Sequence, residues 1–169
     1  MVRPILRHGD GRLLATAQAV DVLNDEVQSL IDDMIETMYA APGVGLAATQ
    51  VGVPLRVFVI DVSANQKGET LRVLVNPQMV FRHGMQIDEE GCLSVPGFAA
   101  YVLRPARVVI AGLDRSGLPV RIEGEGLLAR ALQHEMDHLD GRLFVDRLRG
   151  IKRREILRRI QKKRRAHQW

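Results

Sequence analysis

His134-Glu135-Met136-Asp137-His138 lies inside a longer segment, residues 127–139, whose apolar residues recur at helical spacing. On a helix, residues i and i+4 lie on one face, so the two imidazoles can bind one metal ion. Glu135 is then placed to reach a water molecule on that ion. The ion lowers the pKa of this water molecule to about 7. The pattern predicts a metal-dependent hydrolase in which Glu135 moves the proton.

Two histidines leave the site without a third ligand. Cys92 is the only cysteine of the chain and stands between Gly91 and Leu93. A free cysteine is usually a small buried apolar residue, but a thiolate and two imidazoles make a tetrahedral set with one position open for water. The alternative is a carboxylate such as Glu155, as in metallopeptidases with the same histidine spacing. Five Lys and Arg residues flank Glu155, which favours a paired surface acid there.

Residues 43–50 are a third candidate for a role in the site. Gly43-Val44-Gly45 reads as a loop with accessible backbone amides, and Gln50 adds a neutral side-chain donor. Donors of this kind stabilise an oxyanion. The segment lacks the third glycine of a dinucleotide-binding motif, and no Lys-Ser/Thr pair follows it for phosphate binding.

The remaining pattern predicts two kinds of element around these motifs. Asn24 is a suitable N-cap for a helix over residues 25–40, and Gly141 follows the helix over residues 127–139 at the usual glycine position. Valine-rich runs between turn residues predict strands. The expected strands cover residues 55–62, 71–75, 102–103, 108–113 and 120–123, with a hairpin turn at Asp114–Gly117.

Helices and strands in this order predict an α+β fold. We expect mostly antiparallel sheets around the central helix of His134 and His138, with an N-terminal helix on one side. A basic helix from Leu148 onward is expected at the C-terminus, docked by Ile151, Leu157 and Ile160.

Length and composition fit one globular unit. The chain has 169 residues, of which 46% are hydrophobic and 26% charged. No apolar run approaches the roughly 18 residues of a membrane span, and the residues after Met1 do not form a secretory signal. We therefore expect no membrane partner and a cytoplasmic location. With one cysteine, an internal disulfide is excluded.

Charged residues are distributed unequally along the chain. Residues 149–169 hold ten of the 24 Lys and Arg residues and one acid, so this segment carries about +9 and residues 1–148 about −5. We expect residues 1–148 to be a catalytic domain and residues 149–169 a basic helical extension. The extension is either a solvated helix that aids solubility or a surface that attracts a polyanion.

Three segments in this order resemble the bacterial-type peptide deformylases. The family motifs GxGLAAxQ, EGCLS and QHExDHLxG correspond to residues 43–50, 90–94 and 133–141, and the resemblance runs over residues 5–148. It implies a metal-dependent hydrolase that removes the N-formyl group from the N-terminal methionine of nascent peptides and releases formate. In this reaction a metal-bound water attacks the formyl carbon.

The resemblance also implies a role for each matching residue. Cys92, His134 and His138 would bind the metal, Fe(II) with Zn, Ni or Co as substitutes, and Glu135 would be the general acid/base. Gln50 and the N–H of Leu93 would hold the oxyanion. Gly45 would bond to the backbone of the N-formylmethionyl peptide, which adds as a strand. Val44, Leu127, Arg130 and Ala131 would line the methionine pocket, with the head of Arg130 outside it.

Some bacterial relatives dock a basic C-terminal helix on ribosomal RNA, and the tail of this chain is suited to that partner. Two other functions stay open at this point. One is a metallopeptidase with a carboxylate as third ligand. The other is a ribosome- or RNA-binding domain with a vestigial metal site, against which the presence of Glu135 and Gln50 argues.

Overall fold

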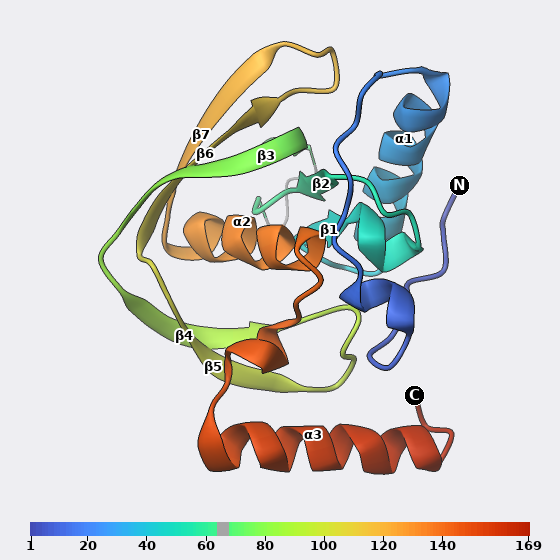
Figure 1. Ribbon diagram of the computed structural model, residues 1–169, viewed down its shortest axis with the longest axis vertical. Helices are drawn as coiled ribbons and strands as arrows, with labels where there is room; N and C mark the ends of the chain where they lie inside the picture. Colours follow the sequence, from blue (N-terminus) through green and yellow to red (C-terminus); the bar gives the residue numbers. More distant parts are fainter. Residues whose placement is uncertain (64–67) are drawn as a thin grey trace.

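The computed structural model describes residues 1–63 and 68–169 and confirms the α+β class (Figure 1). Five strands form one antiparallel sheet in the order β1-β2-β3-β6-β7, and β4 pairs with β5 in a separate two-stranded sheet. The helices are α1 (Asp25–Ala40), α2 (Gly126–Leu139) and α3 (Gly150–Arg165). The strands are β1 (Gly45–Ala47), β2 (Val57–Ile60), β3 (Arg72–His83), β4 (Gln86–Gly91), β5 (Ala99–Arg104), β6 (Arg107–Leu113) and β7 (Pro119–Glu125).

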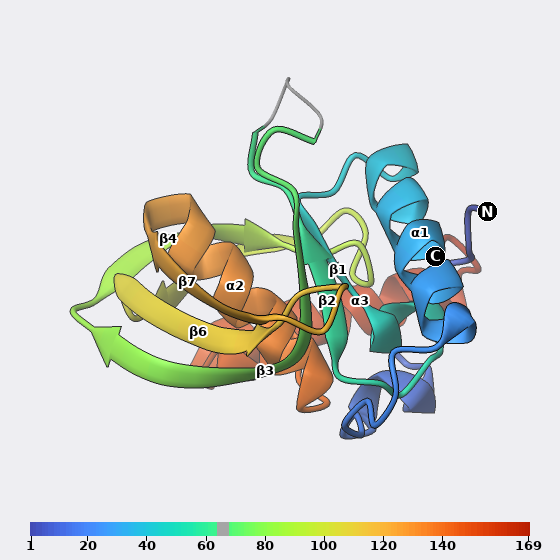
Figure 2. The same cartoon turned by 90° about the horizontal axis from the view of Figure 1, so that it is seen from above.

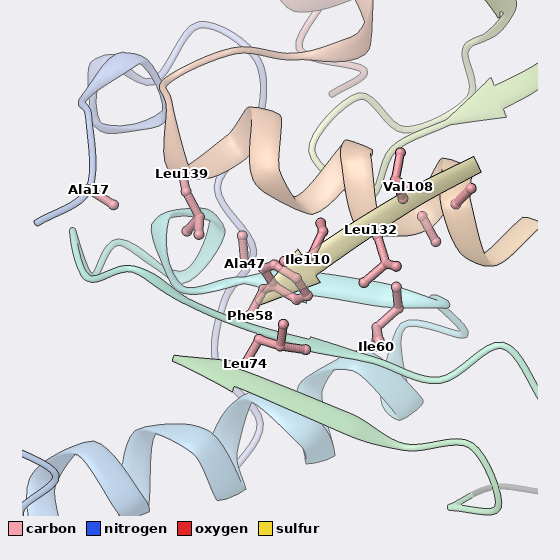
Figure 3. Close-up of a cluster of buried hydrophobic side chains, with 11 residues drawn as sticks. Ala17, Ala47, Phe58, Ile60, Leu74, Val108, Ile110, Leu132 and Leu139 are labelled. Carbon is pink, nitrogen blue, oxygen red and sulfur yellow. The ribbon is translucent and has the colours of Figure 1, made fainter. Parts of the chain in front are cut away.

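Helix α2 lies between the two sheets, as the sequence predicted (Figure 1). One face contacts the five-stranded sheet, where Leu132 and Leu139 pack with Phe58, Ile60 and Leu74 in the main core (Figure 3). The other face carries polar side chains toward β4 and β5. The helix that bears the catalytic motif is therefore fixed on both sides.

Strand β2 separates two cores because its residues alternate between the faces of the sheet. Phe58 and Ile60 pack toward α2, whereas Val57 and Val59 pack with α1 on the opposite face. Figure 2 shows α1 on the other side of the β1–β2 edge from α2. All four side chains are fully buried, so β2 is a central element of the fold.

Local signals placed α1 and the β6–β7 turn correctly. The Asn24 side chain accepts a hydrogen bond of 3.0 Å from the N–H of Val27, and α1 covers the predicted residues 25–40. The Asp114 carboxylate accepts from the N–H groups of Ser116 and Leu118, which forms the predicted β6–β7 turn.

Three predictions about strands were wrong. Gly45 was expected in a loop but begins β1, because it pairs with Ile60 of β2. β3 continues past Val75 to His83, since the left-handed Asn76 introduces an irregularity in the pairing without ending the strand. β4 was not predicted at all, because its Asp88, Glu89 and Glu90 lack an apolar alternation.

Helix α3 docks on the side of β5 through a third apolar cluster. Ile156 and Ile160 are buried against Val95, Val102 and Phe144. The prediction that Ile151 contributes to this docking was wrong: its side chain is 65% exposed, because it lies in the first turn on the outward face.

Among the residues that the structure describes, we find no helix with both the length and the apolar character needed to cross a bilayer.

The turn after α2 generates a test of how this helix is held. Gly141 has a φ of +71°, and a Cβ atom there would lie 2.4 Å from the carbonyl oxygen of Leu14. Gly150 has a similar φ of +60° but open space around it. We expect Gly150→Ala to lower the free energy of unfolding by about 1 kcal/mol through backbone strain alone. Gly141→Ala should cost roughly 1–3 kcal/mol more through the steric clash.

Urea unfolding of the two variants measures this difference. Equal losses of stability would mean that the contact between Leu14 and the turn after α2 does not constrain the helix.

Candidate active site

Three potential metal ligands converge at the polar face of α2. His134 and His138 stand one turn apart, and their Nε2 atoms are 3.1 Å from each other. The Sγ atom of Cys92 lies 3.3 Å from Nε2 of His138. All three donor atoms lie within 4.8 Å of one another. The structure therefore brings together the three residues that the sequence analysis selected, and it leaves Glu155 on the exposed side of α3.

The donor set fits a divalent cation. Around a tetrahedral ion with ordinary Zn–N and Zn–S bonds, neighbouring ligand atoms are roughly 3.3–3.6 Å apart, close to the two distances above. Two ring nitrogens and a sulfur that face one another leave their lone pairs unsatisfied unless a proton or a cation lies between them. Cys92, His134 and His138 could thus hold one metal ion.

Cys92 is held by donors on its own loop and by Gln50. The N–H of Ser94 lies 3.4 Å from Sγ, and Nε2 of Gln50 lies 3.6 Å from it. Gln50 is oriented by two further hydrogen bonds: its Oε1 accepts from the N–H of Ala47, and its Nε2 donates to Oγ of Ser94. The amide of Gln50 therefore points its Nε2 toward Sγ of Cys92 and Oγ of Ser94.

Glu135 is packed against the backbone of β1. A Cβ atom on Gly45 would lie 2.3 Å from Oε1 of Glu135, so only glycine fits at that position. The Glu135 side chain is buried, and Oε2 has no hydrogen-bond partner among the described residues. Burial raises the pKa of Glu135 to about 7. A carboxyl group with this pKa can both accept and donate a proton near neutral pH.

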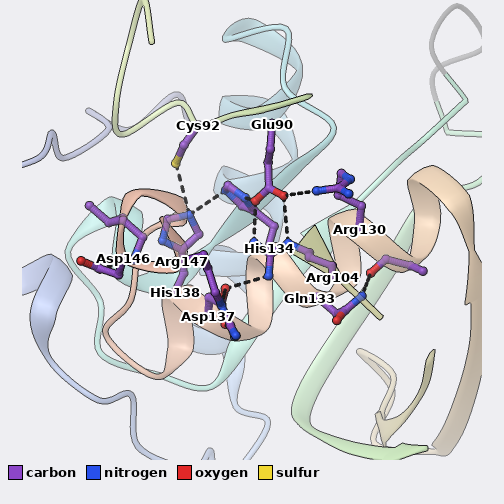
Figure 4. A network of polar contacts seen from close by, with 12 residues as sticks. Glu90, Cys92, Arg104, Arg130, Gln133, His134, Asp137, His138, Asp146 and Arg147 are labelled. Carbon is purple, nitrogen blue, oxygen red and sulfur yellow. Dashed lines mark hydrogen bonds and ion pairs between the residues drawn. The ribbon is translucent and has the colours of Figure 1, made fainter. Parts of the chain in front are cut away.

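The carboxylate of Glu90 links the site to the two-stranded sheet (Figure 4). Its Oε1 accepts from Nδ1 of His134 at 2.5 Å and from Nη2 of Arg104 at 2.5 Å. Its Oε2 accepts from Nε of Arg104 and from Nη1 of Arg130, both at 2.8 Å. Arg104 also donates to Asp137 of α2 at 2.9 Å. Glu90 thereby fixes the ring of His134 in one orientation.

This network sets the protonation of the groups around it. Burial by itself would raise the pKa of Glu90, but the bonds from Arg104 and His134 hold it well below its usual range. Burial would lower the pKa of His134, and the Cys92 and Glu90 side chains raise it instead. Burial and the neighbouring His134 lower the pKa of His138. Glu90 is therefore an anion that orients His134, the role that a carboxylate plays beside a metal-binding histidine.

A cavity of about 600 Å³ opens beside Cys92 and His134. Its wall contains every residue that the sequence analysis assigned to substrate: Val44, Gly45, Leu127, Arg130 and Ala131, together with Gln50, Leu93 and Glu135.

One expectation for this cavity was wrong. The head of Arg130 was expected outside the pocket, but its side chain is only 5% exposed. The guanidinium turns inward because it pairs with the buried carboxylate of Glu90.

The sequence analysis missed the residues that support the ligands. Glu90 and Asp137 were noted only as parts of motifs, and Arg104 was not considered. A usable signal was present for Glu90, since a metal-binding histidine commonly donates its second ring N–H to a carboxylate, and Glu90 lies two residues from Cys92. Arg104 gives no such signal in the sequence.

The fold and the site define a hydrolase of the α+β class whose Cys-His-His group combines two histidines of the central helix with Cys92, which follows β4. A sequence model of the family described as polypeptide deformylase matches residues 2–154. A peptide deformylase of Acetivibrio thermocellus is 53% identical over 165 residues, covering 97% of this chain and 94% of the relative. One from Acidobacterium capsulatum is 44% identical over 169 residues, covering 100% and 99%.

Solved structures agree with the sequence comparison. A peptide deformylase from Legionella pneumophila matches with a TM-score of 0.92 and 47% identity, covering 99% of this chain and 98% of the other. A peptide deformylase from Ehrlichia chaffeensis in complex with actinonin matches with a TM-score of 0.88 and 39% identity, covering 96% and 97%. The chain belongs to the peptide deformylase family and is an enzyme.

The buried carboxylate of Glu90 offers a direct test of the network. We expect Glu90→Gln to lower metal affinity roughly 10–100-fold, because His134 loses its charged acceptor. The same change should cost roughly 3–5 kcal/mol of unfolding free energy, because it removes the buried negative charge that pairs with both Arg104 and Arg130. Competition with a chromophoric chelator and urea unfolding measure the two effects.

Glu89→Gln is the matched control, since Glu89 is the exposed neighbour on the same strand. It should change neither quantity. If the two variants behave alike, Glu90 does not support the site.

Proposed function

We propose that this enzyme removes the formyl group from the N-terminal formylmethionine of nascent peptides and releases formate. The observation that carries the proposal is the convergence of Cys92, His134 and His138 next to a cavity whose lining includes Glu135 and Gln50. Family membership supports the same reaction class.

In this proposal Cys92, His134 and His138 hold one divalent metal ion, Fe(II) in the native enzyme, with Zn, Ni or Co as substitutes. When bound, such an ion acidifies a water molecule and polarises the formyl carbonyl. The Glu90 carboxylate keeps Nδ1 of His134 as the donor and Nε2 as the ligand atom.

Glu135 is the general acid/base. Its buried carboxylate has a pKa of about 7, so it can take a proton from the attacking water and pass it to the leaving amine. Gly45 leaves room for its carboxylate, since a Cβ atom there would lie 2.3 Å from Oε1.

Gln50 and the N–H of Leu93 stabilise the oxyanion. The bond from the N–H of Ala47 to Oε1 of Gln50 directs its Nε2 toward Cys92, so this donor lies at the ligand cluster where the formyl oxygen would bind. Both residues line the cavity. Fixed donors of this kind are effective because they need no reorganisation during the reaction.

The substrate backbone adds as a strand to β1. This strand is at the edge of the five-stranded sheet, so one side of its backbone has no neighbouring strand. Gly45 lies on this edge, and the first side chain of the peptide enters the cavity between Val44, Leu127 and Ala131. β-Strand addition explains how peptides of different sequence can bind.

We test the reaction by measuring formate release from a formyl-Met tripeptide. The unformylated peptide is assayed in parallel for cleavage. We expect Glu135→Gln to lower kcat/KM roughly 10²–10⁴-fold with metal retained. Cys92→Ser should strip or alter the metal. Glu155→Gln is the control for the metallopeptidase alternative and should change neither metal content nor activity. Cleavage of the unformylated peptide, or metal loss in Glu155→Gln, would contradict the proposal.

For the tail we propose a division into a catalytic domain, residues 1–148, and a basic extension, residues 149–169, that binds ribosomal RNA. Helix α3 buries Ile156 and Ile160 and leaves most of its Lys and Arg side chains exposed. Such a surface binds phosphates, and its affinity falls with salt. The cytoplasmic location stays a prediction from the sequence.

Removal of charge from α3 tests this partner. A variant with four exposed bases of α3 changed to Gln should co-sediment with ribosomes at least tenfold more weakly at low salt, with a smaller salt dependence. Hydrolysis of the tripeptide should be unchanged. The four positions are Lys152, Arg154, Arg158 and Arg165.

The matched control removes the same charge from other surfaces. It should co-sediment like the unmodified enzyme, and equal weakening by both variants would show that net charge alone attracts the protein. Its four exposed positions are Arg72, Arg82, Arg121 and Arg142.

A further inference from the structure

A second cavity, of about 330 Å³, borders the loop that follows Cys92. Leu93 and Pro96 of this loop line both the second cavity and the larger one beside the metal ligands. The rest of its lining comes from the N-terminal segment, within residues 2–7, and from the end of α1. The two cavities are therefore neighbours on either side of one loop.

The chain next to β1 leads from the larger cavity to the second one. Residues 42–45 line the larger cavity, and Ala41 and Ala40 line the second. A peptide added to β1 with its formyl end at Gly45 has one open direction, because Ala47 is fully buried. It leaves toward residue 42. Counting one peptide residue for each residue of this segment, the fourth to sixth residues of the peptide lie at the second cavity.

Backbone hydrogen bonds fix the N-terminal wall of this cavity. The N–H of Leu6 donates to the carbonyl of Gln50 at 2.8 Å, and the N–H of His8 donates to the carbonyl of Ser94 at 2.7 Å. Ile5 and Arg7, which alternate with these donors, both line the cavity. The backbone that carries Arg7 is thus tied to the segments that hold Gln50 and Cys92.

The second cavity carries an unbalanced positive charge. Nε of Arg3 donates to Asp33 at 2.8 Å, so this arginine is already paired. Arg7 is exposed and pairs with no carboxylate among the described residues. The described lining contains no acidic side chain and is otherwise mostly apolar. A side chain with an apolar stem and a carboxylate end, such as glutamate, complements these features.

We propose that the second cavity binds the fourth to sixth residues of the substrate peptide and selects an acidic side chain there through Arg7. The inference rests on the proposed function. It extends substrate selection beyond the formylmethionine residue: formylated chains with an early acidic residue are deformylated faster than chains without one.

Formyl-Met hexapeptides that carry a single Glu or Gln test this inference. The residue is placed at position four, five or six, with alanine elsewhere and an amide at the C-terminus, so that Glu is the only carboxylate. The readout is the Glu-to-Gln ratio of kcat/KM within one preparation, from which metal loading cancels. We expect a ratio of about three at one or more of these positions, through a lower KM, which is the size of an exposed ion pair. The same exchange at position two should give a ratio near one.

Two variants of the cavity should abolish the preference. Arg7→Gln should bring the ratio to about one, and Arg7→Glu should bring it below one. Ala40→Glu places a carboxylate in the same lining from α1, and it should also lower the ratio.

Arg121→Gln is the matched control. Arg121 is exposed on β7, at the opposite edge of the five-stranded sheet from β1. It removes the same charge and should leave the ratio at about three.

Two outcomes overturn the inference. One is a ratio near one at all three positions in the unmodified enzyme. The other is a preference for Glu that survives Arg7→Gln, since the basic helix α3 would then attract acidic peptides as a whole. Formate from the Gln peptides in either case leaves the proposed function standing. No formate from any peptide by metal-loaded enzyme refutes the proposed function, and the inference with it.

Discussion

The buried carboxylate of Glu90 is the constraint on which the site depends. It joins β4 to β5 through Arg104 and both strands to α2 through His134. Removing such charges from water costs several kcal/mol per ion, and only a complete set of partners offsets that cost. All four lone-pair positions of Glu90 are used, so any displacement of β4 relative to α2 leaves a buried charge partly unpaired.

The two-stranded sheet shows why this constraint is needed. An isolated pair of strands is only marginally stable in water, yet Cys92 follows β4 directly and must remain within bonding distance of His138. Arg104 anchors the pair to Asp137 on one side. Val102 packs with Phe144 and Ile156 on the other. Cys92 is therefore placed by contacts with α2 and α3 rather than by the strands themselves.

Helix α2 combines an apolar and a polar face within the centre of the molecule. Leu132 and Leu139 pack in the main core, while His134 and Asp137 face the ionic network. A buried polar face of this kind requires that nearly every group be paired. Among the described residues of α2, two donors of Arg130, one oxygen of Glu135 and Nδ1 of His138 are exceptions.

Elements with a strong local signal were predictable, and those formed by pairing were not. The cap at Asn24 and the apolar spacing gave α1 its correct bounds. β1 and β4 escaped prediction because three residues at Gly45–Ala47 and a run of acids at Asp88–Glu90 have no strand character alone. They become strands only because β2 and β5 supply hydrogen-bond partners.

The same division holds for the site. The sequence by itself determined the identities of Cys92, His134, His138, Glu135 and Gln50, because fixed spacing within short motifs is a local property of the chain. Tertiary structure alone decided that the head of Arg130 is buried against Glu90 and that Arg104 supports Glu90. Those contacts join residues 14 to 40 positions apart. The reason is physical: a buried ion pair depends on what surrounds both partners, and only the folded chain sets those surroundings.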